Sequence, residues 1–151
     1  MKLAEALQER ADLNTRIEQL RGRLNAACIV QEGEKPQEDP EALLNELDMC
    51  IQRLETLIAA INRTNVETLI EGETITALIA RKDCLRLKIS AYRNLAGSAA
   101  EVNYRARGSE IRFLPTVNVS ALRSTVDRLS KEYRVLDNKI QAANWSIDLK
   151  L

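Results

Sequence analysis

The chain has no histidine among its 151 residues, and aromatic residues make up only 3% of it. Without an imidazole, catalytic triads that use a histidine base and zinc sites with histidine ligands are excluded. Five glycines and three prolines leave few places for tight turns, which disfavours an all-β sandwich or barrel. The longest uninterrupted apolar run is five residues, whereas a helix that spans a bilayer needs roughly 20.

The three cysteines, Cys28, Cys50 and Cys84, are far apart and form no Cys-x-x-Cys pair. A zinc ribbon or a dithiol redox motif therefore has no support, and we expect the three to pack as small hydrophobic side chains, with a reactive thiol as the alternative for Cys28 and Cys84. The N-terminal residues follow the pattern of an amphipathic helix and not that of a signal peptide. We therefore expect a cytoplasmic protein for which membrane association is unfavourable.

The formal net charge is zero, but acidic and basic side chains are concentrated in opposite halves of the chain. Residues 1–76 carry 8 basic and 15 acidic side chains, whereas residues 77–151 carry 14 basic and 7 acidic ones. The basic residues near 81–93 could form a phosphate-binding face, but the aromatic side chains that stack on bases are nearly missing. The sequence therefore predicts no nucleic-acid partner. We expect the two halves to pair, either within one chain or between two copies.

Apolar residues recur at alternating spacings of three and four in four segments, a pattern typical of helices that pack on other helices. The spacing predicts helices over residues 2–27, 40–63, 74–96 and 119–147. Asp39 followed by Pro40 is a favourable start for the second helix, and Gly97 is expected to end the third. The predicted fold is one mainly all-α domain over residues 1–151, an elongated four-helix bundle that resembles a coiled coil.

The segments between the predicted helices carry weaker patterns. Residues 29–31 are expected to be extended and to lead into an acidic loop. Residues 62–73 are expected to interrupt the helical pattern, with a turn at Glu71 and Gly72. Two strand-like runs, 102–106 and 110–114, predict a small hairpin or an ordered loop between the third and fourth helices.

The second predicted helix carries more apolar residues than one seam requires. Leu44, Ile51 and Ile58 repeat every seven residues beside the main seam. A second column of this kind exceeds what one bundle covers, so it predicts a helix–helix interface between copies of the chain. We therefore expect a homo-oligomer without enzymatic activity, and we expect no cofactor.

Two groups of polar residues are candidate sites, and no spacing singles out a catalytic residue. The acidic loop is dense enough in carboxylates to attract a hard cation, although it lacks the regular spacing of a calcium loop. Its weak metal-ligand candidates are Glu32, Glu34, Glu38 and Asp39. A polar run at the end of the second helix and the single tryptophan near the end of the fourth are candidates for a ligand contact or a subunit contact. These candidates are Asn62, Arg63, Asn65, Asn144 and Trp145.

Several of these segments together resemble the septicolysin-like family of small, largely uncharacterised bacterial proteins. The resemblance covers nearly the whole chain and is carried by residues 31–34, 38–40, 61–65, 110–113 and 141–149. It implies no catalytic residue, and the family name implies a membrane-active lysin. A secreted pore former needs an export signal and a segment that covers a membrane, and the residues show neither. Self-association is therefore the leading hypothesis, with a lysin or a carboxylate metal-binding protein as alternatives.

Overall fold

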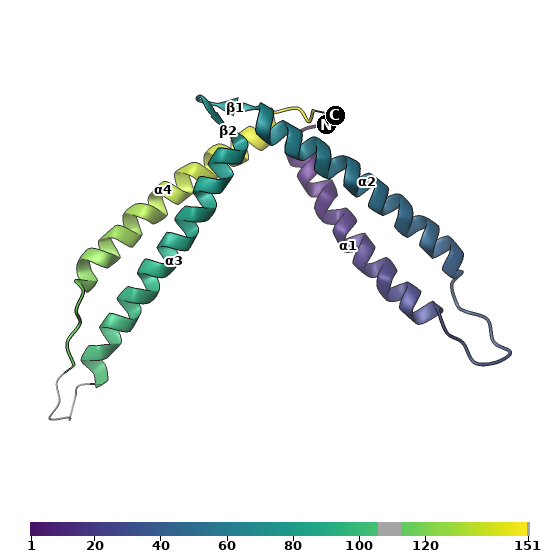
Figure 1. Cartoon of the computed structure of the whole chain (residues 1–151), viewed down its shortest axis with the longest axis horizontal. Helices are drawn as coiled ribbons and strands as arrows, with labels where there is room; N and C mark the ends of the chain where they lie inside the picture. Colours follow the sequence, from purple (N-terminus) through teal and green to yellow (C-terminus); the bar gives the residue numbers. More distant parts are fainter. Residues whose placement is uncertain (106–112, 151) are drawn as a thin grey trace. The chain divides into compact units, whose positions relative to one another are not determined.

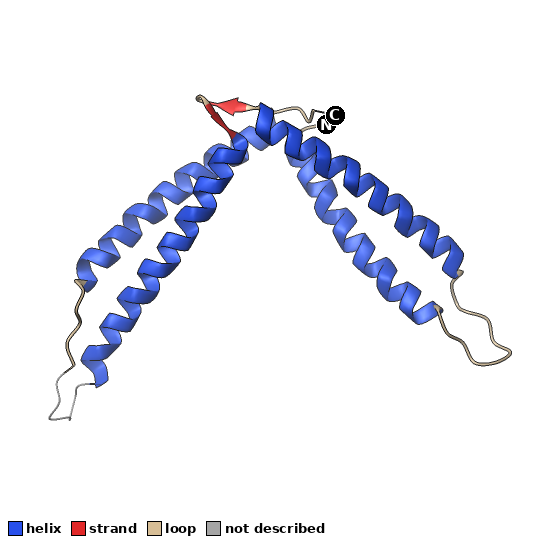
Figure 2. Cartoon of the chain, viewed as in Figure 1, coloured by secondary structure: helices blue, strands red, loops and turns tan. Residues whose placement is uncertain are grey.

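The computed structural model describes residues 1–105 and 113–150, and these residues are predominantly helical (Figures 1 and 2). The elements in chain order are α1 (Leu3–Ala27), α2 (Pro40–Glu67), β1 (Leu69–Ile70), β2 (Glu73–Thr74), α3 (Ile75–Arg105) and α4 (Val119–Ser146). The two short strands pair with each other between α2 and α3. The predicted mainly all-α class is therefore confirmed.

The chain divides into two compact units. Unit 1 comprises Met1–Leu69 and Ala143–Leu151, and unit 2 comprises Ile70–Ala142. Unit 1 contains 9 basic and 14 acidic residues, and unit 2 contains 13 basic and 8 acidic ones, so their formal charges are −5 and +5. The separation of charge along the sequence is thus a separation between two structural units.

Unit 1 is built on a hairpin in which α1 and α2 lie side by side (Figure 1). Leu20 and Ala27 of α1 form a buried cluster with Leu43 of α2, and Leu24 and Leu47 pack against it. Leu20, Leu24 and Ala27 follow the alternating spacing of four and three, and Leu43 and Leu47 are four residues apart in the same kind of pattern. The alternating spacing of three and four therefore identifies the faces that meet.

The two ends of the chain are joined within unit 1. The backbone N–H of Leu3 donates to the carbonyl of Ile147 at 2.9 Å. Lys2 and Asp148 form an isolated β-bridge, and their side chains form an ion pair at 2.9 Å. The first turn of α1 is therefore fixed to the segment that follows α4, and Figure 1 shows the two termini close together.

Unit 2 is built on a second hairpin, formed by α3 and α4 (Figure 1). One buried cluster contains residues of both helices, namely Leu78, Leu85, Ile89, Val126, Leu129, Leu136 and Ile140. Lys82 lies four residues after Leu78 and three before Leu85, so it occupies a position of the apolar spacing of α3 where a charged residue is an exception. Its Nζ lies 3.0 Å from the carboxylate of Asp137 on α4, and both side chains are largely buried. The cation on the seam therefore connects the two helices.

The predicted end of the second helix is wrong. α2 continues past residue 63 to Glu67, so the polar run 62–65 lies inside its last turns and does not end the helix. Thr64 in this run is fully buried, in phase with the buried Leu57 and Ile61. Burial of Thr64 outweighs the low helix propensity of the asparagine and threonine residues in this run.

The predicted end of the third helix and part of the predicted hairpin are also wrong. α3 passes through Gly97 and ends at Arg105, so residues 102–105 are helical and not strand-like. Ala96 and Ala99, on either side of the glycine, are both buried, and this burial offsets the roughly 1 kcal/mol that a glycine costs inside a helix. Of the rest of the predicted hairpin, 106–112 lie outside the described residues, and 113–114 belong to no strand.

The turn predicted at Glu71 and Gly72 is confirmed. These two residues connect β1 and β2, and they have positive φ angles of 52° and 89°. A glycine at the second position is favourable because it has no Cβ to restrict this conformation. Residues 29–31, which were expected to be extended, belong to no strand and precede a turn in the loop between α1 and α2.

Candidate functional site

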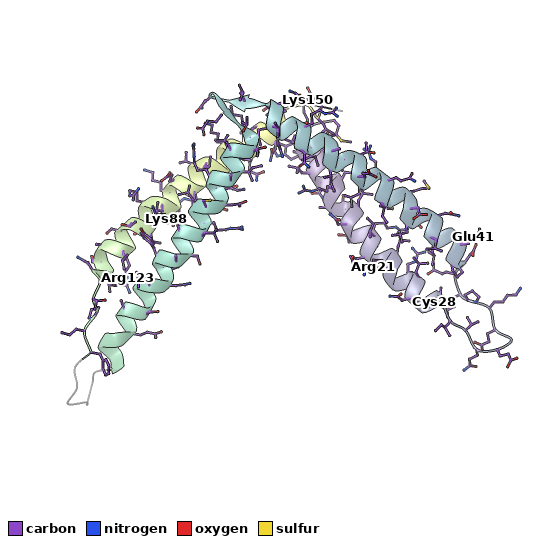
Figure 3. The ribbon with its side chains drawn as sticks, viewed as in Figure 1. Arg21, Cys28, Glu41, Lys88, Arg123 and Lys150 are labelled. Carbon is purple, nitrogen blue, oxygen red and sulfur yellow. The ribbon has the colours of Figure 1, made fainter. Side chains whose placement is uncertain are left out.

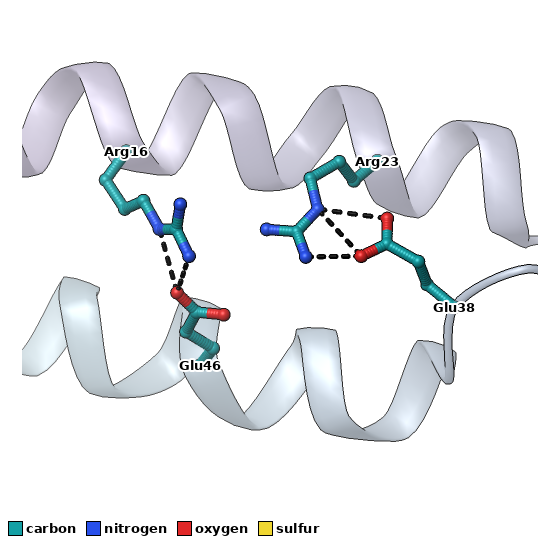
Figure 4. Close-up of polar contacts among 4 residues, drawn as sticks. All are labelled: Arg16, Arg23, Glu38 and Glu46. Carbon is teal, nitrogen blue, oxygen red and sulfur yellow. Dashed lines mark hydrogen bonds and ion pairs between the residues drawn. The ribbon is translucent and has the colours of Figure 1, made fainter.

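The four candidate metal ligands do not converge. Glu38 accepts hydrogen bonds from Nε of Arg23 at 3.0 and 3.1 Å (Figure 4). Asp39 caps α2 by accepting a backbone N–H of its first turn at 3.1 Å, and Glu32 and Glu34 are exposed. Over residues 1–105 and 113–150, no group of three acidic, cysteine or histidine side chains is placed to hold a metal ion. Glu38 and Asp39 thus have structural roles.

The candidate residues on α2 surround a buried anchor that sequence reasoning missed. Asn62 and Arg63 are exposed and Asn65 is half-buried, but Thr64 between them is fully buried. Its hydroxyl donates to the carbonyl four residues earlier at 2.8 Å and accepts the backbone N–H of Lys150 at 2.9 Å. The available signal was its position, three residues after Ile61 and therefore in phase with the apolar spacing of this helix.

Asn144 and Trp145 are neighbours on α4 with opposite surroundings. Asn144 is 7% exposed, whereas Trp145 is 67% exposed. Trp145 borders an open hollow of about 360 Å³, together with Ala4, Gln8 and Asp12 of α1. Exposed tryptophans are enriched at protein interfaces, so a subunit contact at Trp145 stays a prediction.

The cysteines differ in burial. Cys50 is half-buried and packs against the core cluster of unit 1, as expected. Cys28 and Cys84 are exposed, so the expectation that they pack in the core is wrong. All three thiols are free.

One edge of the α1–α2 hairpin is closed by ion pairs. Three arginine–glutamate pairs connect the two sides of the hairpin, namely Arg16–Glu46, Arg53–Glu9 and Arg23–Glu38. Figure 4 shows the first and the last of them. Hydrogen bonds from the guanidinium groups are the main cause that lowers the pKa of Glu9 and of Glu38 below the ordinary value of 4.5.

Acid is expected to weaken the fold of unit 1 through these pairs. Arg23 lowers the pKa of Glu38 in the folded protein below the ordinary value of 4.5. The pair therefore contributes fully to the free energy of unfolding above pH 4.5, and this contribution is lost as the pH falls through the lower pKa of the folded state. Glu38→Gln removes this titration and keeps the shape of the side chain. We expect the urea midpoint to fall less steeply in Glu38→Gln than in wild type between about pH 5 and pH 3. Identical slopes would contradict this assignment.

The opposite edge of α2 carries exposed apolar residues, which we call the α2 stripe: Leu44, Ile51 and Ile58. They are 49%, 46% and 40% exposed. At 100° per residue, Ile51 lies roughly 200° around the helix from Arg53, so the α2 stripe and the ion pairs occupy opposite edges. The second column predicted from the sequence is therefore uncovered in the part of the chain that the structure describes.

Carboxylates accompany the α2 stripe along the helix. Glu41, Asp48 and Glu55 also repeat every seven residues, each three residues before a residue of the stripe. All three are exposed, and Glu41 stands in the first turn of α2 (Figure 3). No lysine or arginine within the described ranges pairs with them. This surface is therefore both apolar and acidic.

Unit 2 has an open edge of the opposite charge, along one side of the α3–α4 hairpin. A hollow of about 440 Å³ lies there, with Val135 and Leu136 as its apolar lining. Its charged lining consists of Arg81, Arg128, Lys131, Glu132 and Lys139. Lys88 and Leu95 continue the heptad column of Arg81 along α3. We call Arg81, Lys88, Leu95, Arg128, Lys131, Val135 and Lys139 the basic edge.

These features define a class of helical protein with two helical-hairpin units, one acidic and one basic. The family of unknown function DUF6847 matches residues 10–149, and the chain belongs to this family. A solved crystal structure, of a functionally unknown conserved protein from Corynebacterium diphtheriae, is 36% identical over 99% of both chains with a TM-score of 0.92. No curated protein matches the chain.

The comparisons correct one prediction. The resemblance to the septicolysin-like family does not identify the family of this chain, because the family that matches is DUF6847. The lysin alternative came from the name of that other family and loses its support with it. Among the described helices, none is both long and apolar enough to cross a membrane.

Proposed function

We propose that the protein is a non-enzymatic assembly protein that acts by associating with further copies of itself. The observation that carries this proposal is the α2 stripe, whose three large apolar side chains repeat every seven residues and are 40–49% exposed. A heptad column is the surface with which one helix packs on another. Covering a leucine or isoleucine completely stabilises a complex by about 1.5–3 kcal/mol.

The position of the α2 stripe supports the same proposal. The ion-paired edge of the hairpin already connects α1 to α2, whereas the stripe edge presents apolar atoms next to the half-buried Leu47 and Leu54. A helix placed along the stripe would extend the apolar core of unit 1 without breaking any of its ion pairs. We include a cytoplasmic location in the proposal, supported by the 29% share of charged residues.

Polar substitution of the α2 stripe is expected to dissociate the assembly. We expect wild type to elute as a stable multiple of 17.0 kDa, and the variant with Leu44→Ser, Ile51→Ser and Ile58→Ser to elute as a monomer. Size-exclusion chromatography with light scattering gives the mass, and circular dichroism checks that α2 remains helical.

The matched control changes exposed apolar residues of α2 that lie off the stripe. Met49→Ser combined with Val66→Ser removes side chains that are also exposed, at a similar cost in helix propensity. We expect this variant to keep the wild-type mass. A wild-type protein that remains monomeric into the high micromolar range would overturn the proposed function.

A further inference from the structure

We propose that the α2 stripe of one copy packs against the basic edge of unit 2 of a second copy. This inference rests on the proposed function and identifies the surface that covers the stripe. The pairing is between unlike surfaces, because each copy carries the α2 stripe with its accompanying carboxylates and also the basic edge.

Charge complementarity is the first argument for this pairing. Asp48 and Glu55 have no basic partner in the described part of the chain. On the basic edge, Arg128 and Lys131 are exposed and likewise have no acidic partner there. Bringing the two surfaces together places these unpaired charges opposite unpaired charges of the other sign, which favours encounter and fixes orientation.

The same charges disfavour the simplest alternative, in which two α2 stripes pack on each other. That contact would place Glu41, Asp48 and Glu55 of one copy beside the same carboxylates of the other. The stripe has no lysine or arginine of its own to compensate for them. Like charges placed opposite each other are a common means of excluding a partner.

The apolar parts of the two surfaces also correspond. The α2 stripe runs from Leu44 to Ile58 and the α3 column of the basic edge from Arg81 to Leu95, and in each the last residue comes 14 positions after the first. Both distances correspond to roughly 21 Å of helix. Val135 is 62% exposed and Leu95 is 45% exposed, and the aliphatic stems of lysine and arginine cover further apolar surface.

The other side of unit 2 is a less suitable partner for the α2 stripe. It has an open hollow of about 450 Å³ that is lined by three arginines, two serines, Ile89 and Tyr133. The three arginines are Arg86, Arg93 and Arg134. Its apolar lining is set back, because Ile89 is buried in the core and Tyr133 is only partly exposed. The lining of this hollow therefore offers positive charge but no exposed aliphatic side chain to the stripe, so we use it as a control surface.

Complementary charge reversal tests the pairing. The first variant, with a reversed stripe surface, carries Asp48→Lys and Glu55→Lys. The second variant, with a reversed basic edge, carries Arg128→Glu and Lys131→Glu. Glu41 is left unchanged because an acidic residue in the first turn favours α2. We expect each variant alone to associate at least ~10-fold more weakly than wild type in sedimentation equilibrium, because each places like charges at the contact. We expect an equimolar mixture of the two variants to recover the wild-type association.

Two controls carry the same change in charge at other places. Glu32→Lys with Glu34→Lys changes exposed carboxylates of the loop between α1 and α2. Arg93→Glu with Arg134→Glu changes the control surface on the other side of unit 2. Both are expected to associate like wild type, which separates an effect of position from an effect of net charge. Circular dichroism confirms that all four variants fold.

The outcomes separate this inference from the proposed function. If wild type associates but the mixture of variants does not recover the association, the pairing of stripe and basic edge is wrong and the proposed function stands. If each variant alone associates as tightly as wild type, the pairing is also wrong. A monomeric wild type would overturn both. Recovery in the mixture, together with unaffected controls, is the result that the pairing requires.

Discussion

Replacing Leu57 with alanine is expected to lower the free energy of unfolding by about 2–5 kcal/mol. Leu57 lies on α2 in the seam that faces α1, and it is 1% exposed. The substitution removes apolar atoms that folding takes out of water, and it leaves a cavity that the surrounding helices fill only in part. Urea unfolding followed by circular dichroism measures the loss.

The adjacent residue provides the matched control. Ile58 is also a large aliphatic residue of α2, but it belongs to the α2 stripe and is 40% exposed. We expect Ile58→Ala to cost less than about 1 kcal/mol when unfolding is measured at low protein concentration, because partial exposure reduces the transfer term. Low concentration is needed because association adds to the apparent stability. Equal losses at the two positions would contradict the assignment of Leu57 to the core and Ile58 to the surface.

The faces of the helices were predictable because they depend on spacing within one segment. Leu43, Leu57 and Ile61 are buried at the positions that the alternating spacing indicates, and the heptad column at Leu44, Ile51 and Ile58 lies on the surface. The start of α2 was predictable for a similar reason. A capping aspartate followed by proline satisfies the first turn with atoms from neighbouring residues.

The end of α2 was not predictable, because a residue distant in the chain contributes to it. Thr64 continues α2 through a polar run, and its hydroxyl binds the backbone of Lys150, 86 residues later. Lys82 finds its carboxylate partner 55 residues away, at Asp137. A seam indicates that a helix has a partner, but it does not identify which helix that is. The division into an acidic and a basic unit therefore required the structure.

The family resemblance was mistaken because short polar motifs carried it. The structure explains several of these residues by local needs of the fold. Asp39 caps a helix, Glu38 binds Arg23, and Asp148 binds Lys2. Helix caps and surface ion pairs recur in unrelated helical proteins, so such motifs are weak evidence of a family even when several occur together.

Thr64→Val is expected to lower the free energy of unfolding by about 1–3 kcal/mol, the cost of leaving a buried polar group without its partner. Valine has nearly the shape of threonine, so the packing of this fully buried side chain is retained. The substitution removes two hydrogen bonds, the one that the hydroxyl donates to the carbonyl of Ala60 at 2.8 Å and the one that it accepts from the backbone N–H of Lys150 at 2.9 Å. Loss of the second leaves the N–H of Lys150 without its partner. Urea unfolding measures the stability, and amide hydrogen exchange at Lys150 reports whether this bond is the cause.

The same substitution one turn later is expected to have the opposite sign. The hydroxyl of Thr68 is buried but has no hydrogen-bond partner within the described residues, so Thr68→Val removes a polar group whose burial is not compensated. We expect Thr68→Val to be neutral or stabilising and to leave exchange at Lys150 slow. If both valine variants reduced stability equally, the loss at Thr64 would reflect packing and not its hydrogen bond. Faster exchange at Lys150 in Thr64→Val alone would instead show that this one hydroxyl holds the C-terminal segment against α2.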